Sequence, residues 1–117
     1  MSRQQAEARG RRAETLCAFW LRIRGWRILA RRVRTRMGEV DLIARRGKMV
    51  AFIEVKARTS AADLDFAIDE RRLSRVAAAA RTLAAKYARP GDDMRIDVML
   101  IAPRRFPRHL VNVWHGG

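Results

Sequence analysis

The sequence is organised around residues 37–56, MGEVDLIARRGKMVAFIEVK. Two runs rich in Val, Ile, Leu and Phe flank Arg46-Gly47, and this pattern predicts two strands joined by a tight turn. Both runs are apolar on both faces, as expected for a hairpin buried in the middle of a sheet. Four charged residues interrupt them: Glu39, Asp41, Glu54 and Lys56. Buried charges must be paired or bind a metal, so the hairpin carries a candidate site.

Strand geometry predicts that these charges gather on one face. Side chains two residues apart point the same way, so Glu39 joins Asp41 and Glu54 joins Lys56. A two-residue turn at Arg46-Gly47 would place Glu39 opposite Glu54 and Asp41 diagonal to it. Diagonal neighbours lie roughly 7–8 Å apart, which allows two carboxylates to share one cation. A loop of odd length would separate the pairs onto opposite faces.

The motif resembles a known nuclease signature. Asp41 followed by Glu54-Val55-Lys56 is similar to the Asp…Glu-x-Lys pattern of the PD-(D/E)XK superfamily. The longer pattern, residues 38–44 with residues 52–58, resembles the YraN-like family of small bacterial proteins, which is grouped with Holliday-junction-resolvase-like nucleases. The resemblance spans about residues 9–113. It implies an α/β fold with a restriction-endonuclease-like core, in which helices flank a mixed central β-sheet.

The cluster also suggests a metal site and a mechanism. Oxygen ligands from Asp41 and Glu54, with the backbone carbonyl of Val55, suit Mg²⁺ or Mn²⁺. Glu39 could complete the shell or hold a second ion, and Lys56 would orient the attacking water. Glu14 matches by position a first-helix glutamate that the resemblance places beside the metal. Its spacing alone favours a solvated carboxylate.

Composition bounds the class of protein. The 117 residues suit one domain covering 1–117, in which residues 1–3 could be disordered, and 49% hydrophobic residues suffice for one core. No apolar run approaches the roughly 20 residues of a membrane span, and the N-terminus lacks the apolar segment of a secretory signal. Cys17, the single cysteine, excludes an intramolecular disulfide and is expected to be a buried thiol. These features predict a cytoplasmic protein without a membrane partner.

The net charge predicts a polyanionic partner. Lys and Arg number 26 against 12 Asp and Glu, which gives +14, and 23 of the 26 are Arg. Such a field attracts nucleic acid, and arginine binds phosphate in a bidentate manner. A genome biased toward Arg would explain the choice of Arg over Lys, but it does not explain the excess of positive charge. Candidate nucleic-acid-binding residues flank the motif: Arg34, Arg36, Arg58, Arg71, Arg72 and Arg75. For residues 31–36, a solvated basic edge strand is an equally good interpretation.

Periodicity predicts the other elements. A helix over residues 4–24 would bury a stripe made of Ala13, Leu16, Cys17, Trp20 and Ile23. A strand follows at residues 26–33, and after the hairpin a helix covers residues 70–88. Two strands, at 95–102 and 109–114, complete the order helix, three strands, helix, two strands. Asp97 is expected to pair with an arginine, and His109 and His115 are expected at the surface. The spacing of Asp63 and Asp65 superficially suggests a calcium loop, which the flanking sequence does not support.

Two functions are compatible with these features. The first is a metal-dependent endonuclease that hydrolyses phosphodiester bonds in DNA, with branched or otherwise structured DNA expected over plain duplex and DNA expected over RNA. The alternative is an inactive nucleic-acid-binding module that keeps the nuclease fold. A homodimer is compatible with either function. The acidic cluster discriminates between them, because a binding module has no need of three carboxylates beside DNA.

Overall fold

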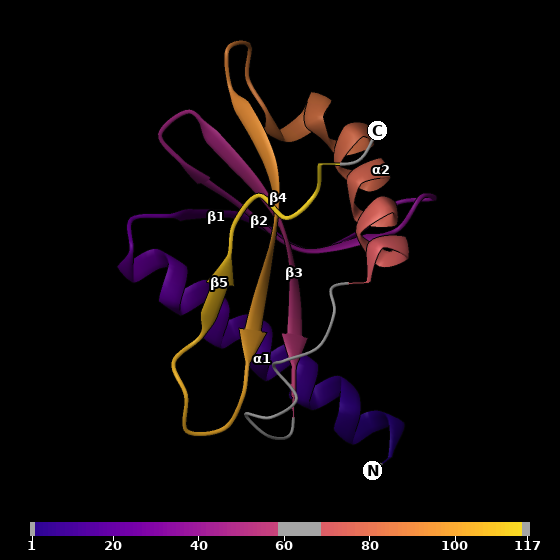
Figure 1. Cartoon of the computed structure of the whole chain (residues 1–117), viewed down its shortest axis with the longest axis vertical. Helices are drawn as coiled ribbons and strands as arrows, with labels where there is room; N and C mark the ends of the chain where they lie inside the picture. Colours follow the sequence, from indigo (N-terminus) through magenta and orange to yellow (C-terminus); the bar gives the residue numbers. More distant parts are fainter. Residues whose placement is uncertain (1, 59–68, 116–117) are drawn as a thin grey trace.

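The structure is a computed structural model that describes residues 2–58 and 69–115 (Figure 1). Asp63 and Asp65 lie outside the described residues. The elements follow the predicted order, with the bounds α1 Arg3–Ile23, β1 Arg27–Arg34, β2 Glu39–Arg46, β3 Met49–Ala57, α2 Glu70–Tyr87, β4 Asp93–Ile101 and β5 Arg108–Leu110. Ser2, which the sequence allowed to be disordered, caps the first turn of α1 by accepting a hydrogen bond from the backbone N–H of Gln5.

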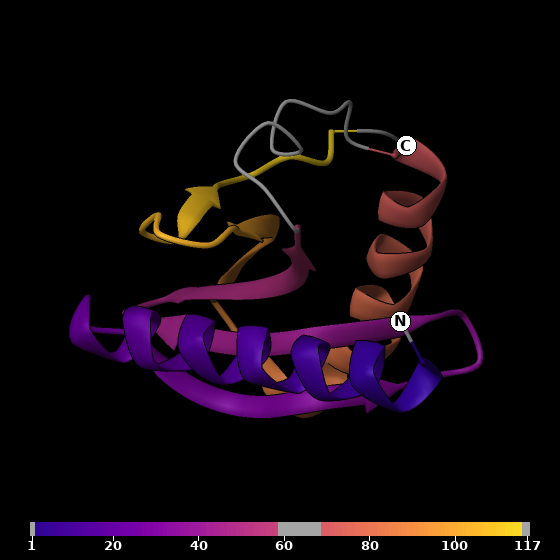
Figure 2. The same cartoon turned by 90° about the horizontal axis from the view of Figure 1, so that it is seen from below.

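The described strands form one mixed sheet in the order β1-β2-β3-β4-β5, so the motif strand β3 is central. Strands β3 and β4 are parallel, and the other neighbouring pairs are antiparallel. Helix α1 crosses one face and α2 covers the other (Figure 2). Each helix buries a separate apolar cluster against the sheet, around Leu21 and Ile53 under α1 and around Phe52 and Leu73 under α2. The mixed α/β fold is therefore confirmed.

The buried face of α1 differs from the predicted stripe. Ala13, Cys17, Ala18 and Leu21 are buried as the helix packs on the sheet, but Leu16 and Ile23 are exposed. Apolar residues therefore extend around α1 beyond the face that the sheet covers, and periodicity alone could not show which part of that wide stripe is buried.

The motif hairpin turns one residue later than predicted. Arg46 pairs with Met49, which makes Gly47-Lys48 the two-residue turn, and Gly47 adopts the positive φ of 62° that this turn requires. The loop keeps its even length, but the register shifts by one residue in each strand. Leu42 pairs with Ile53 as the last pair of the ladder, so Glu39 does not pair with Glu54.

Alternation along β2 breaks close to Asp41. Leu42 and Ala44 pack beneath α1, whereas Val40 and Ile43 pack beneath α2. On the neighbouring strand, Arg32 has a φ of 52°, a left-handed conformation that is uncommon outside glycine. The irregularity therefore affects both strands at the same level, immediately beside the motif.

Asp97 anchors the end of the chain to the sheet. Asp97 is fully buried in β4. Its Oδ1 accepts a hydrogen bond from Arg95 Nε at 3.0 Å and another from the backbone N–H of Asn112 at 2.9 Å. The Nε2 atom of His109 lies 2.7 Å from its second oxygen. The arginine partner matches the prediction, but the surface location predicted for His109 was wrong, since β5 brings this ring against Asp97. His115 is exposed.

We expect Asp97→Ala to lower the free energy of unfolding by about 3–5 kcal/mol, because it leaves the half-buried Arg95 guanidinium and the Asn112 N–H without their acceptor. Chemical denaturation measures the change. Asp93→Ala, an exposed position at the start of the same strand, is the matched control and should change stability by no more than about 0.5 kcal/mol. Equal stability of the two variants would contradict the anchoring role.

Candidate active site

Glu54 lies at the centre of the candidate site. Strand β3 directs it toward α2, where Arg72 Nε approaches Oε1 at 2.6 Å, and Lys56 Nζ lies 3.6 Å from the same oxygen. Glu54 is only 3% exposed. Its other oxygen, Oε2, is buried and has no hydrogen-bond partner within the described residues. A buried carboxylate oxygen without a donor is costly, so this atom points to a ligand.

Asp41 occupies the point where β2 and β3 separate. The ladder between the strands ends at Leu42 and Ile53, and beyond it the Val55 N–H donates to Asp41 Oδ2 at 2.8 Å. The pKa of Asp41 is raised to about 6, mainly by burial. The hydrogen bond from Val55 acts to lower it, and the carboxylates of Glu14, Glu54 and Glu39 act to raise it. The raised pKa marks a crowded acidic environment of the kind found at functional sites.

Glu14 joins this environment from α1. It is buried, and Arg32 Nε donates to its Oε1 at 2.7 Å. The solvated carboxylate favoured by spacing was therefore wrong. The sequence did not identify Arg32 as the partner of Glu14. The left-handed backbone at Arg32 cannot be predicted from sequence, because this conformation is usually signalled by glycine and here the residue is arginine.

Cys17 gives an independent indication of where these acids lie. Burial raises the pKa of its thiol to about 12, and the charges of Asp41 and Glu14 act in the same direction. The thiol is thus a buried, unreactive neighbour of the acidic group, as the sequence predicted.

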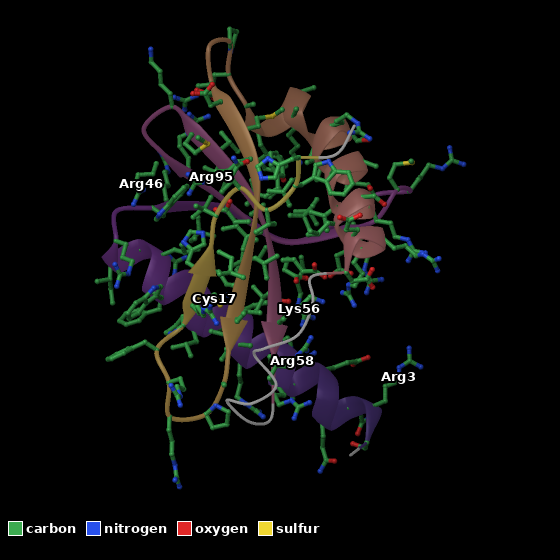
Figure 3. The ribbon with its side chains drawn as sticks, viewed as in Figure 1. Arg3, Cys17, Arg46, Lys56, Arg58 and Arg95 are labelled. Carbon is green, nitrogen blue, oxygen red and sulfur yellow. The ribbon has the colours of Figure 1, made fainter. Side chains whose placement is uncertain are left out.

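Lys56 follows Glu54 on the same face of β3 and is also buried. Burial lowers its pKa, Glu54 acts to raise it, and the positive charges of Arg72 and Arg58 lower it (Figure 3). A lysine whose ammonium form is destabilised in this way exchanges a proton more readily than a solvated one.

Glu39 stands apart from the other acids. It is exposed at the start of β2 and forms a surface ion pair with Arg34, Nε to Oε2 3.5 Å. The predicted position opposite Glu54 was wrong, because the turn is shifted, the ladder with β3 ends at Leu42 and Ile53, and Glu39 pairs with Arg34 of β1.

Most of the predicted phosphate-binding arginines border the site. Arg71, Arg72 and Arg75 begin α2, and Arg34 and Arg36 lie at the turn between β1 and β2. This turn approaches α2 closely. A Cβ on Gly38 would lie 3.1 Å from the carbonyl oxygen of Arg75, so the motif glycine permits the contact. Arg58 differs from the other five, because it is half-buried and follows the end of β3, two residues beyond Lys56.

The donors fit a hard cation only in part. Asp41 and Glu54 supply carboxylate oxygens, and the unpartnered Oε2 of Glu54 is available to a ligand. Yet across residues 2–58 and 69–115, no three acidic, His or Cys side chains converge as a complete metal site. The two carboxylates therefore provide a partial ligand set, which backbone and solvent oxygens would have to complete.

The fold agrees with that of a solved structure. Hjc, a Holliday junction resolvase from Archaeoglobus fulgidus, matches 86% of this chain and 73% of its own at a TM-score of 0.62 and 21% identity. The chain thus shares the fold of that resolvase. The model of the uncharacterised protein family UPF0102 matches residues 13–101. The chain belongs to this family, and the YraN-like resemblance is confirmed.

Its relatives are similar over nearly the whole length. A UPF0102 protein of Sphingopyxis alaskensis is 68% identical over 97% of this chain and 98% of its own, and one of Erythrobacter litoralis is 60% identical over the same shares. A UPF0102 protein of Rhizorhabdus wittichii is 59% identical over 97% of both chains. Neither α1 nor α2, the helices in the described residues, is apolar enough over sufficient length to span a bilayer.

The pKa of Asp41 generates a stability prediction. It is raised from 3.8 to about 6 in the folded state, so the unfolded chain loses its proton first as pH rises, and stability declines between about pH 4 and 6. We expect Asp41→Asn, which can still accept the hydrogen bond from Val55, to be about 1–3 kcal/mol more stable than wild type at pH 7.5.

This difference should shrink as pH falls toward 4, measured by chemical denaturation in EDTA. The control is Glu39→Gln, which removes an exposed carboxylate and should change stability little at either pH. A variant Asp41→Asn less stable than wild type at pH 7.5 would contradict the assigned environment.

Proposed function

We propose that this protein is a metal-dependent endonuclease that hydrolyses phosphodiester bonds in structured DNA. The observation that carries the proposal is the buried Oε2 of Glu54, which has no hydrogen-bond partner in the described chain although Asp41 and Lys56 lie beside it. A purely structural site would gain stability by satisfying or removing this oxygen. Its retention in a chain of net charge +14 favours a site that acts on a polyanion.

Asp41, Glu54 and the backbone carbonyl of Val55 would hold Mg²⁺ or Mn²⁺. Glu14 would add negative charge near the ion without binding it directly. When bound, such an ion neutralises phosphate charge and increases the acidity of a coordinated water. The remaining chemistry belongs to the chain. Arg72 orients the Glu54 carboxylate through Oε1 and leaves Oε2 for the ligand.

Lys56 Nζ would orient the attacking water and donate to a phosphate oxygen as negative charge develops there. Its lowered pKa makes the ammonium a better proton donor than a solvated lysine. Because Glu54 lies 3.6 Å away, the ammonium stays anchored on the same side of β3 as the carboxylates.

The arginines would hold the substrate backbone. Arg71 and Arg75 are exposed on α2, and Arg36 is exposed on the adjoining turn. Contacts to phosphate position a duplex without identifying bases, which favours recognition of DNA shape. The similarity in fold to Hjc, named as a Holliday junction resolvase, supports branched DNA as the first substrate to test.

The competing function is a binding module that keeps the fold without turnover. It requires the same arginines but assigns no role to Lys56 or to the acids. The incomplete set of converging ligands is the observation that favours it, so the two functions must be separated by assays that score cleavage and binding independently.

Binding should weaken steeply with salt under either function. If six or more phosphates are contacted, raising NaCl from about 50 to 200 mM should lower DNA affinity by roughly three orders of magnitude or more. Fluorescence anisotropy with labelled four-way-junction, flap and duplex DNA measures the slope. Affinity that does not vary with salt would exclude the phosphate contacts.

Lys56→Ala should separate enzyme from binding module. We expect wild type with Mg²⁺ or Mn²⁺ to cut branched or single-stranded DNA, and we expect the variant to cut roughly 10²–10³-fold more slowly with nearly unchanged affinity. An interaction made in the transition state lowers turnover without weakening ground-state binding. Asp41→Asn should behave similarly.

Lys48→Ala, which removes an exposed lysine from the hairpin turn, is the matched control and should cut like wild type. Absence of metal-dependent cutting by wild type on every substrate would favour the binding module. Cleavage by Lys56→Ala at the wild-type rate would assign the activity to another site or a contaminant.

A further inference from the structure

The outer side of α1 carries aromatic and basic side chains that the candidate active site does not use. Phe106, which is 81% exposed, stacks on Trp20 with ring centroids 5.4 Å apart. The guanidinium of Arg24 lies 4.2 Å from the centroid of the Trp20 ring. Phe19, 60% exposed, adds a further apolar ring to the same helix. These rings and cations thus extend from α1 onto the segment that follows β4.

A hollow of about 510 Å³ adjoins this stack on the side of the candidate active site. Its floor is apolar and includes Ala13, Leu16 and Ala57. Its lining contains no carboxylate among the described residues, whereas five arginines surround it: Arg9, Arg12, Arg58, Arg104 and Arg105. A hollow that combines an apolar floor with the positive charge of Arg9, Arg12, Arg104 and Arg105 complements a ligand that is both anionic and flat or apolar.

A second hollow of about 270 Å³ lies on the other side of Trp20. Arg24 and Arg46 line it, and Arg46 is held 4.6 Å from the centroid of the Trp26 ring. Arg95 also lines it, although Asp97 neutralises that charge. In Figure 3, Arg46 and Arg58 lie toward opposite ends of the sheet. We call the surface made of both hollows and the Trp20–Phe106 stack the arginine–aromatic tract.

The tract begins close to the candidate active site. Arg58 follows Lys56 by two residues along the chain, a distance of roughly 7 Å in extended backbone. Ala13 in the floor of the first hollow precedes the buried Glu14 in α1. Arg58 acts electrostatically on Lys56 and also lines the first hollow, so it connects the candidate active site to the tract.

We propose that the arginine–aromatic tract binds the unpaired strand of a branched DNA substrate, so that the preferred substrates carry a single-stranded arm. This inference rests on the proposed function and specifies its substrate class. Exposed rings stack on bases only where these are unpaired, and interleaved arginines bind the backbone, which is the combination that single-strand-binding surfaces use. A second copy of this chain is a poorer occupant, because it would bring the same arginines face to face.

The test measures binding in EDTA, so it does not depend on cleavage. Labelled oligothymidylate of about 16 nucleotides and a blunt hairpin duplex are titrated with wild type, Phe106→Ala and Phe106→Trp. We expect Phe106→Ala to bind the single strand roughly tenfold more weakly, as for loss of one base–aromatic stack. Duplex affinity should change less than about twofold, and Phe106→Trp should retain single-strand binding.

A charge-matched pair isolates the local effect of the arginines. Arg104→Gln combined with Arg105→Gln is compared with Arg81→Gln combined with Arg89→Gln, whose residues are exposed outside the tract. Both doubles lose two positive charges, so the long-range field weakens equally. The tract double should lose at least about fivefold more single-strand affinity than the control double, because only it removes contacts.

Several outcomes would overturn the inference. These are single-strand binding unchanged in Phe106→Ala, equal losses for the two charge doubles, or a wild-type dimer in sedimentation that becomes monomeric in Phe106→Ala without a change in single-strand affinity. Tighter, Phe106-dependent binding of an acidic peptide containing phenylalanine would assign the tract to a protein partner instead. If wild type cuts no substrate but Phe106→Ala still loses single-strand binding, the proposed cleavage fails and the tract stands as a single-strand-binding surface.

Discussion

The structure depends on how it accommodates three acidic groups where β2 and β3 separate. Arg32 neutralises Glu14 from β1 and Arg72 neutralises Glu54 from α2, so the two pairs reach the group from opposite sides. Among the described residues Asp41 accepts a hydrogen bond from the Val55 N–H and pairs with no cation, and its pKa is raised. Helix α2 supplies the cation that pairs with Glu54, and the irregular backbone at Arg32 brings the cation that pairs with Glu14 on α1. These pairs allow the charges to be buried in one apolar fold.

The positive charges around Glu54 satisfy only one of its two carboxylate oxygens. Glu54 uses one oxygen for both of its cations, while the second oxygen remains buried without a donor. Sites under selection for stability alone do not retain such an atom, since replacing it is usually easy and stabilising. The two oxygens of Glu54 therefore have different roles. Oε1 holds the structure together through Arg72, and Oε2 is left for a ligand.

Element order, the hairpin and its acidic residues were predictable, because apolar periodicity and turn chemistry are local properties. The failures came from tertiary contacts. The turn moved by one residue to Gly47-Lys48, and the resulting register leaves Glu39 away from Glu54. Burial of Glu14 depends on Arg32, eighteen residues away and in an unusual conformation. His109 became half-buried only because β5 docks beside Asp97.

The parallel pairing of β3 with β4 has a consequence for biosynthesis. Met49 is aligned with Asp93 and Ala57 with Ile101, so the second neighbour of the central strand is made only after α2 has been synthesised. A nascent chain can close the β2–β3 hairpin early but must expose one edge of an apolar strand until β4 arrives. The same strand carries Glu54 and Lys56, so the charged pair can enter its buried environment only at the end of folding, and an incompletely folded chain would lack an assembled acidic site.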